Sequence, residues 1–160
     1  CFSFLRRITL LFFFLFQSTP DLSHLCYRYV RICIICDPKP LFQTKFDLLH
    51  GGDPFFGVMV LMGAAFPNVY VNLSSMPSHS YDNFKHWLSV FLDRVPCHKI
   101  TLGWDEFTPE LVAADGPYTR DIVASVLAEK IDNGLYSYEL ALEIAKDIMH
   151  RNAETLFGIS

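Results

Sequence analysis

The chain has 160 residues, of which 51% are hydrophobic and 19% are charged, a balance that excludes general disorder and provides enough apolar material for one core. Its 13 Lys and Arg against 17 Asp and Glu give a net charge of -4, and this lack of a basic excess makes nucleic-acid binding a poor explanation of its function. Because the first residue is Cys rather than Met, we expect the chain to be an incomplete piece of a longer product.

The first 36 residues differ in composition from the rest. Arg6 and Arg7 precede an apolar run at residues 8–16. This run is similar to the apolar part of a signal peptide and is too short to cross a bilayer. The alternatives to a targeting segment are a buried strand, or sequence foreign to the native protein. We therefore separate a Phe- and Cys-rich leader, residues 1–36, from a domain of residues 37–160.

The cysteines argue against a four-cysteine zinc site, because Cys33 and Cys36 form a single CxxC pair with no second one to match it. Both lie in an apolar run, and we expect them to be inert buried thiols. This usage indicates a reduced, cytoplasmic protein; secretion is the alternative if the leader is a genuine signal peptide. We expect no membrane segment.

From residue 45 onward, short apolar runs alternate with segments of helical periodicity. Strands are predicted at residues 46–49, 69–73 and 100–102, and helices at 54–65 and 81–95. A further helix is predicted to open at residues 115–117 and to end near 133–134. A last helix follows, with Ser137 as its N-cap.

Strands that alternate with helices predict parallel strands joined by crossover helices, and therefore the α/β class. About three βα units followed by terminal helices are half of what a barrel of about 250 residues requires. The pattern thus predicts the C-terminal part of a TIM-like (β/α)8 barrel. A doubly wound sheet is the alternative, but its glycine-rich phosphate fingerprint is missing. Because half a barrel exposes strand edges, we expect the isolated chain to aggregate.

Two chemically active side chains are predicted at strand ends, where parallel α/β folds place their catalytic groups. His50 follows the first strand and precedes Gly51 and Gly52. It could be a metal ligand, a general base or a hydrogen-bonded structural residue. Asp105 follows the third strand, where it could bind a cation or cap the next loop. Trp104 beside it could be a pocket wall or a packed aromatic.

These motifs together resemble a known family. The residues that carry the resemblance are FDLLHGG at 46–52, AFPNVYVNLS at 65–74 and KITLGWD at 99–105, and it extends through the helical residues 126–130 and 141–153. They are similar to the C-terminal half of the amidohydrolase-related family, metal-dependent hydrolases with a distorted TIM barrel. The resemblance is closest to members that stand alone in bacteria or are fused to a glutamine-synthetase-like domain.

The resemblance implies a hydrolase that attacks a C–N or related bond of a small-molecule substrate with water activated by a divalent metal, often zinc. Asp105 corresponds to the eighth-strand aspartate, a metal ligand and general base. His50 corresponds to the sixth-strand histidine, a metal ligand or a group that polarises the substrate carbonyl. Both residues are therefore candidates for the catalytic and the metal site.

The chain also departs from the family, because the His-x-His pair of its first strand occurs nowhere here. With at most two ligands, we expect this chain to be inactive by itself. The alternatives are a non-catalytic scaffold or partner-binding remnant, and a decarboxylase or isomerase of the same superfamily.

Overall fold

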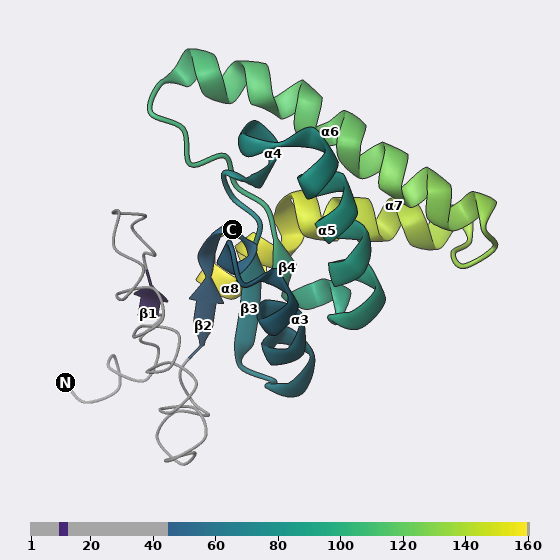
Figure 1. Cartoon of the computed structure of the whole chain (residues 1–160), viewed down its shortest axis with the longest axis horizontal. Helices are drawn as coiled ribbons and strands as arrows, with labels where there is room; N and C mark the ends of the chain where they lie inside the picture. The colour runs from purple at the N-terminus through teal and green to yellow at the C-terminus, as the bar shows by residue number, and fades with distance from the viewer. Residues whose placement is uncertain (1–9, 13–44, 160) are drawn as a thin grey trace.

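The computed structural model describes residues 10–12 and 45–159, and Figure 1 shows them as a small sheet surrounded by helices. The strands are β1 (Leu10–Phe12), β2 (Phe46–Leu48), β3 (Val69–Asn72) and β4 (Ile100–Thr101). They form one sheet in the order β1-β2-β3-β4, and every neighbouring pair is parallel. The predicted α/β class with a parallel sheet is confirmed. Apart from β1, the predicted leader with Cys33 and Cys36 lies outside the described residues.

The helices occupy the intervals between the strands and the whole C-terminal third. They are η2 (Leu49–Gly52), α3 (Phe56–Ala65), α4 (Met76–His79), α5 (Tyr81–Arg94), η3 (Cys97–Lys99), α6 (Pro109–Asp132), α7 (Tyr138–Lys146), the π-helical turn η4 (Asp147–Arg151) and α8 (Asn152–Phe157). Helices α3 and α5 end before Pro67 and Pro96, as their sequences predict. The N-cap at Ser137 is confirmed, because its hydroxyl accepts a hydrogen bond from the Leu140 amide.

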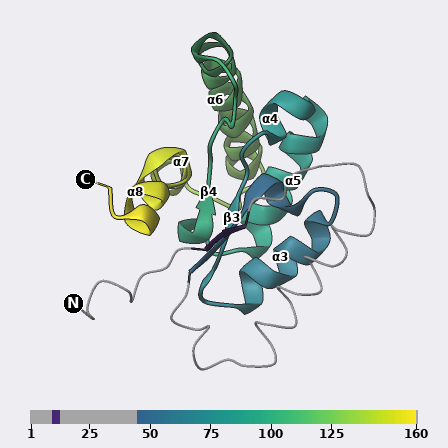
Figure 2. The same cartoon turned by 90° about the vertical axis from the view of Figure 1, so that its left-hand side faces the viewer.

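The two faces of the sheet differ in chemistry because side chains alternate along each strand. One face joins the hydrophobic core with α3 and α5, and its residues are Phe46, Leu48, Val69, Val71 and Ile100. The opposite face carries Asp47, Tyr70, Asn72 and Thr101. Figure 2 shows α3 and α5 on one side of the strands, and α7 and α8 beyond β4.

The predicted start of the long helix at residues 115–117 is wrong. Helix α6 begins eight residues earlier than Pro117, at Pro109, where the Thr108 hydroxyl accepts a hydrogen bond from the Leu111 amide. Pro117 lies inside the helix instead of opening it. Residues 107–114 are all exposed, so the first turns of α6 extend beyond the body of the molecule (Figure 1).

The outer edge of β4 is contacted by the C-terminal helices. The Asn152 amide at the start of α8 donates to the carbonyl oxygens of Ile100 and Cys97, each at 2.7 Å. Within residues 10–12 and 45–159, no helix combines the length and apolarity needed to cross a bilayer.

Candidate functional site

His50 and Asp105, the two residues predicted at strand ends, lie side by side. Strands β2 and β4 are parallel to the β3 strand between them, so their C-terminal ends meet at one edge of the sheet. The Nε2 atom of His50 lies 3.6 Å from the Oδ2 atom of Asp105. The histidine side chain is one-fifth exposed and the aspartate is half exposed, so this edge is open to a ligand.

The end of β3 supplies the hydrogen bonds that orient both side chains. The His50 Nδ1 atom lies 3.0 Å from the Ser74 carbonyl oxygen and 3.4 Å from the Ser74 hydroxyl. Because a carbonyl oxygen can only accept, Nδ1 carries a hydrogen in this contact, and Nε2 is the ring nitrogen that faces Asp105. The neighbouring Ser75 hydroxyl donates to Asp105 Oδ2 at 3.1 Å. Two consecutive serines therefore fix the two predicted residues.

The backbone is strained at the same three strand ends. Among the described residues, positive φ outside glycine occurs at His50 (59°), Ser75 (60°) and Asp105 (56°). Each such residue costs of order 1 kcal/mol or more, and strain of this kind clusters at functional sites. The Ser75 amide also donates to the Trp104 carbonyl at 3.3 Å, which ties the loop after β3 to the loop after β4.

Position 52, two residues after His50, requires glycine both because a side chain would clash and because the backbone has a positive φ. Its φ is +76°, and a Cβ built on it would lie 1.9 Å from Met59 Cγ. Gly51, with φ of +59°, would place a Cβ 2.6 Å from Met76 Sδ. The two glycines thus let the chain turn from His50 directly onto the core without widening the site.

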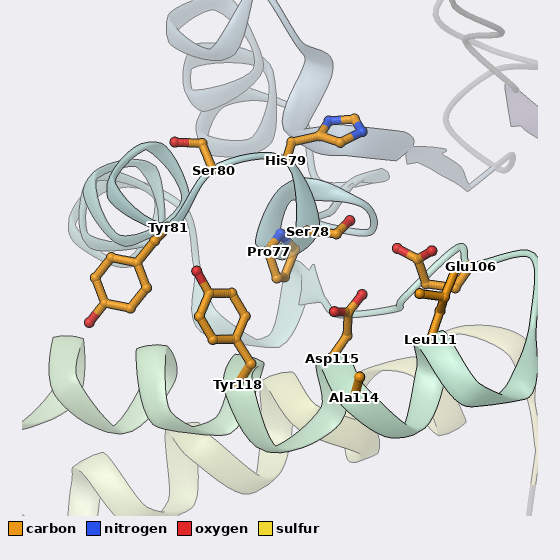
Figure 3. Close-up of a pocket in the computed structure, with 10 residues that line it drawn as sticks. All are labelled: Pro77, Ser78, His79, Ser80, Tyr81, Glu106, Leu111, Ala114, Asp115 and Tyr118. Atoms are coloured by element: carbon orange, nitrogen blue, oxygen red, sulfur yellow. The ribbon is translucent and has the colours of Figure 1, made fainter.

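Two hollows adjoin this edge. A small cavity of about 60 Å³ is lined by His50, Asp53, Phe56, Met76, His79, Ser80, Asn83 and Phe84. A larger recess of about 640 Å³ lies between residues 77–81 and helix α6, as Figure 3 shows. His79 and Ser80 line both hollows, so the recess adjoins the small cavity beside His50.

The recess has a mixed lining with an acidic end. Tyr81 and Tyr118 pack against each other at one end of it, with ring centroids 5.7 Å apart. The carboxyls of Glu106 and Asp115 line its other end (Figure 3). Desolvation, together with the hydrogen bond and the charge of Glu106, raises the pKa of Asp115 above its usual range. A volume of this size matches small-molecule pockets.

The two donor atoms of the His50–Asp105 pair fit one metal ion. Two ligands about 2.1 Å from a tetrahedral zinc lie about 3.4 Å apart, close to the 3.6 Å between Nε2 and Oδ2. The bond from Nδ1 to a backbone carbonyl is the support that metal-ligating histidines usually have. Across residues 10–12 and 45–159, no group of three or more His, Cys, Asp or Glu side chains could hold a metal together.

Sequence reasoning missed the partners of the pair. Ser74 and Ser75 directly follow a predicted strand, but nothing in their identity marks them as hydrogen-bond partners of His50 and Asp105. His79 lies at none of the predicted strand ends and in none of the family motifs, yet it lines both hollows. Trp104 packs toward Gly116 of α6, and its indole nitrogen is buried without a hydrogen bond.

Comparison with known proteins yields a partial match. No protein-family profile matches the chain. Protein fluG of Emericella nidulans is 28% identical to it over 120 residues. The aligned region is 74% of this chain and 14% of fluG, so the chain spans a small part of the length of this curated relative.

Proposed function

We propose that this chain is the C-terminal part of a TIM-like barrel and contributes His50 and Asp105 to an amidohydrolase-type, metal-dependent hydrolase. The observation that carries the proposal is the 3.6 Å approach of His50 Nε2 to Asp105 Oδ2 at the C-terminal ends of parallel strands. The orientation of both side chains by adjacent serines supports it, as does the backbone strain at these residues.

A divalent metal, zinc by the chemistry of a nitrogen and a carboxylate donor, would supply Lewis-acid activation of water and of the substrate carbonyl. Asp105 accepts the proton of the attacking water and returns it to the leaving nitrogen of a C–N bond. The Ser74 carbonyl accepts the Nδ1 hydrogen of His50, so Nε2 is the ring nitrogen that would bind the metal. The recess of about 640 Å³ holds the part of the small-molecule substrate that does not react.

The test uses the longest polypeptide that the gene encodes, assayed for bound metal by elemental analysis and for hydrolysis of an amide library. We expect zinc in the purified protein, and we expect Asp105→Asn to lower turnover by about a thousandfold because it removes a general base. Asp121→Asn, an exposed aspartate on α6, is the matched control and should leave turnover unchanged.

Full turnover in Asp105→Asn would overturn the proposal. A protein that binds no divalent metal and hydrolyses no amide would also contradict it, and would favour the non-catalytic scaffold instead. Loss of turnover in Asp121→Asn as well would show that the assay reports folding and not the site.

A further inference from the structure

A buried carboxyl lies on β2 three residues before His50. Asp47 is fully buried on the sheet face opposite the hydrophobic core. Its Oδ2 atom accepts a hydrogen bond of 3.0 Å from the Asn72 amide on β3, while its Oδ1 atom is buried without a partner. A buried carboxyl with an unpaired oxygen costs stability, so an apolar side chain in this strand would be the more stable choice.

Asn72 connects this carboxyl to the candidate site. Its Oδ1 atom accepts from the Ser74 backbone amide at 3.0 Å, while its Nδ2 atom donates to Asp47. The carbonyl of the same Ser74 accepts from His50 Nδ1 at 3.0 Å. The next residue, Ser75, donates its hydroxyl to Asp105. Hydrogen bonds and the covalent backbone of the two serines therefore connect Asp47, through Asn72, to both residues of the pair.

We infer that Asp47 and Asn72 are positioning residues: they hold the backbone of Ser74 where its carbonyl fixes the ring and tautomer of His50, with Nε2 toward Asp105. Both polar atoms of the Asn72 side chain, Oδ1 and Nδ2, are hydrogen-bonded, so the amide group cannot rotate without breaking one contact. The burial of Asp47, which raises the pKa of its carboxyl, is the energetic cost of this arrangement. The inference rests on the proposed function only in treating His50 as a residue of the candidate active site.

The test measures the tautomer of His50 by long-range proton–nitrogen correlation NMR on the 160-residue chain with ¹⁵N-labelled histidine. The His50 signals are assigned by their loss in His50→Gln. In the native chain we expect the Nδ1-protonated tautomer to dominate. Asp47→Leu removes the acceptor for Asn72, and should shift the tautomer ratio roughly two- to tenfold toward Nε2 protonation, the effect of one net hydrogen bond.

A double exchange provides the rescue. In Asp47→Asn combined with Asn72→Asp, the new amide on β2 can donate to the new carboxylate on β3, whose second oxygen can accept from the Ser74 amide. We expect this variant to recover the native tautomer ratio, while Asn72→Leu alone does not. Tyr136→Phe removes the hydrogen bond of 3.2 Å to the Leu92 carbonyl, a contact between the loop after α6 and helix α5, and is the control that should leave the ratio unchanged.

Stability is measured beside the tautomer in every variant. We expect Asp47→Leu to unfold at the same urea concentration as the native chain or a higher one, because a buried carboxyl has been replaced by an apolar side chain. A native tautomer ratio in both Asp47→Leu and Asn72→Leu would overturn the inference. The NMR readout needs neither metal nor substrate, so its failure is distinguishable from failure of the proposed hydrolase activity.

Discussion

Gly52 shows how a single residue sets the geometry next to His50. Its positive φ and the 1.9 Å approach of a built Cβ to Met59 act together, and Met59 is itself buried in the core. A side chain at this position must therefore displace packed core atoms while its backbone is strained. Strained backbone and overpacking each cost about 1–3 kcal/mol.

We predict that Gly52→Ala lowers the free energy of unfolding by about 3 kcal/mol or more, measured by urea titration. Gly57→Ala is the matched control, because nothing lies within 4 Å of a Cβ built there and the residue is helical. The control should be neutral or stabilising by up to about 1 kcal/mol. Equal losses in the two variants would contradict the steric account.

The buried carboxyl of Asp47 should make the stability of the chain depend on pH. Burial raises the pKa of its carboxyl in the folded chain above the ordinary value of 3.8. At pH values below 3.8 both states hold the proton, and above it the unfolded state loses the proton first. Stability attributable to Asp47 therefore falls as the pH rises from 3.8 through the raised pKa. Subtracting the urea-unfolding curve of Asp47→Asn from that of the native chain across pH 3 to 8 should isolate this fall, and a flat difference would contradict it.

Some residues of the candidate site could be predicted from the sequence, and others could not. His50 and Asp105 are predictable because each follows an apolar run that must be a strand. Ser74 is not, because its contact with His50 depends on the register between β2 and β3, in which Leu48 pairs with Val71. Residues 24 positions apart meet only through that pairing, and the strand pattern alone leaves the register open.

At the scale of elements, helix α6 shows where local signals compete. Pro117 is a typical helix opener, but Thr108 and Pro109 provide a cap and a first turn of their own upstream. The helix continues through Pro117 because its later turns pack through buried residues against the core, among them Ile122 and Val126. Tertiary packing therefore outweighs the local penalty of an internal proline, which sequence periodicity cannot weigh.

The attachment of α6 to α5 is a second element-scale prediction. The nearly buried Lys130 donates to Asp93 at 2.6 Å, whereas Lys85 pairs with Glu129 at 2.5 Å across the more exposed side of the same helices. We expect Lys130→Ala to cost about 1–3 kcal/mol, since it removes both packed methylenes and a charge-assisted bond. Lys85→Ala should cost less than Lys130→Ala, because solvent screens the ion pair that it removes. Thermal unfolding of both variants compares the two losses of stability. A larger loss in Lys85→Ala would show that burial does not determine how much each ion pair stabilises the chain.

At the scale of the whole molecule, the sequence predicts a half barrel with open strand edges. In the structure, the side-chain amide of Asn152 donates a hydrogen bond to the Ile100 carbonyl on the outer edge of β4. The parallel strands and the α/β class were predictable from alternation, but this contact was not, because it joins residues 52 positions apart. The C-terminal helix therefore protects part of the edge that the isolated chain would otherwise expose.

We predict that Asn152→Leu lowers the free energy of unfolding by about 2–3 kcal/mol, because two backbone carbonyls lose their donor. The newly unpaired edge should also increase self-association, seen as larger species in size-exclusion chromatography. Thr155→Leu, an exposed position on the same helix, controls for added hydrophobicity. An unchanged elution profile in Asn152→Leu would show that this amide does not guard the edge.

The internal proline of α6 has a consequence for hydrogen exchange. Pro117 has no amide hydrogen, so the ladder of backbone hydrogen bonds is interrupted between the exposed turns at 109–114 and the packed turns that follow. Amides before the proline exchange through local opening, and those near Val126 exchange only when the core opens. Leu111 and Asp115 belong to the first group and line the large recess. We therefore expect the recess wall formed by these turns to open more often than the folded core, so that an occupant is detected first as slowed exchange at residues 109–114.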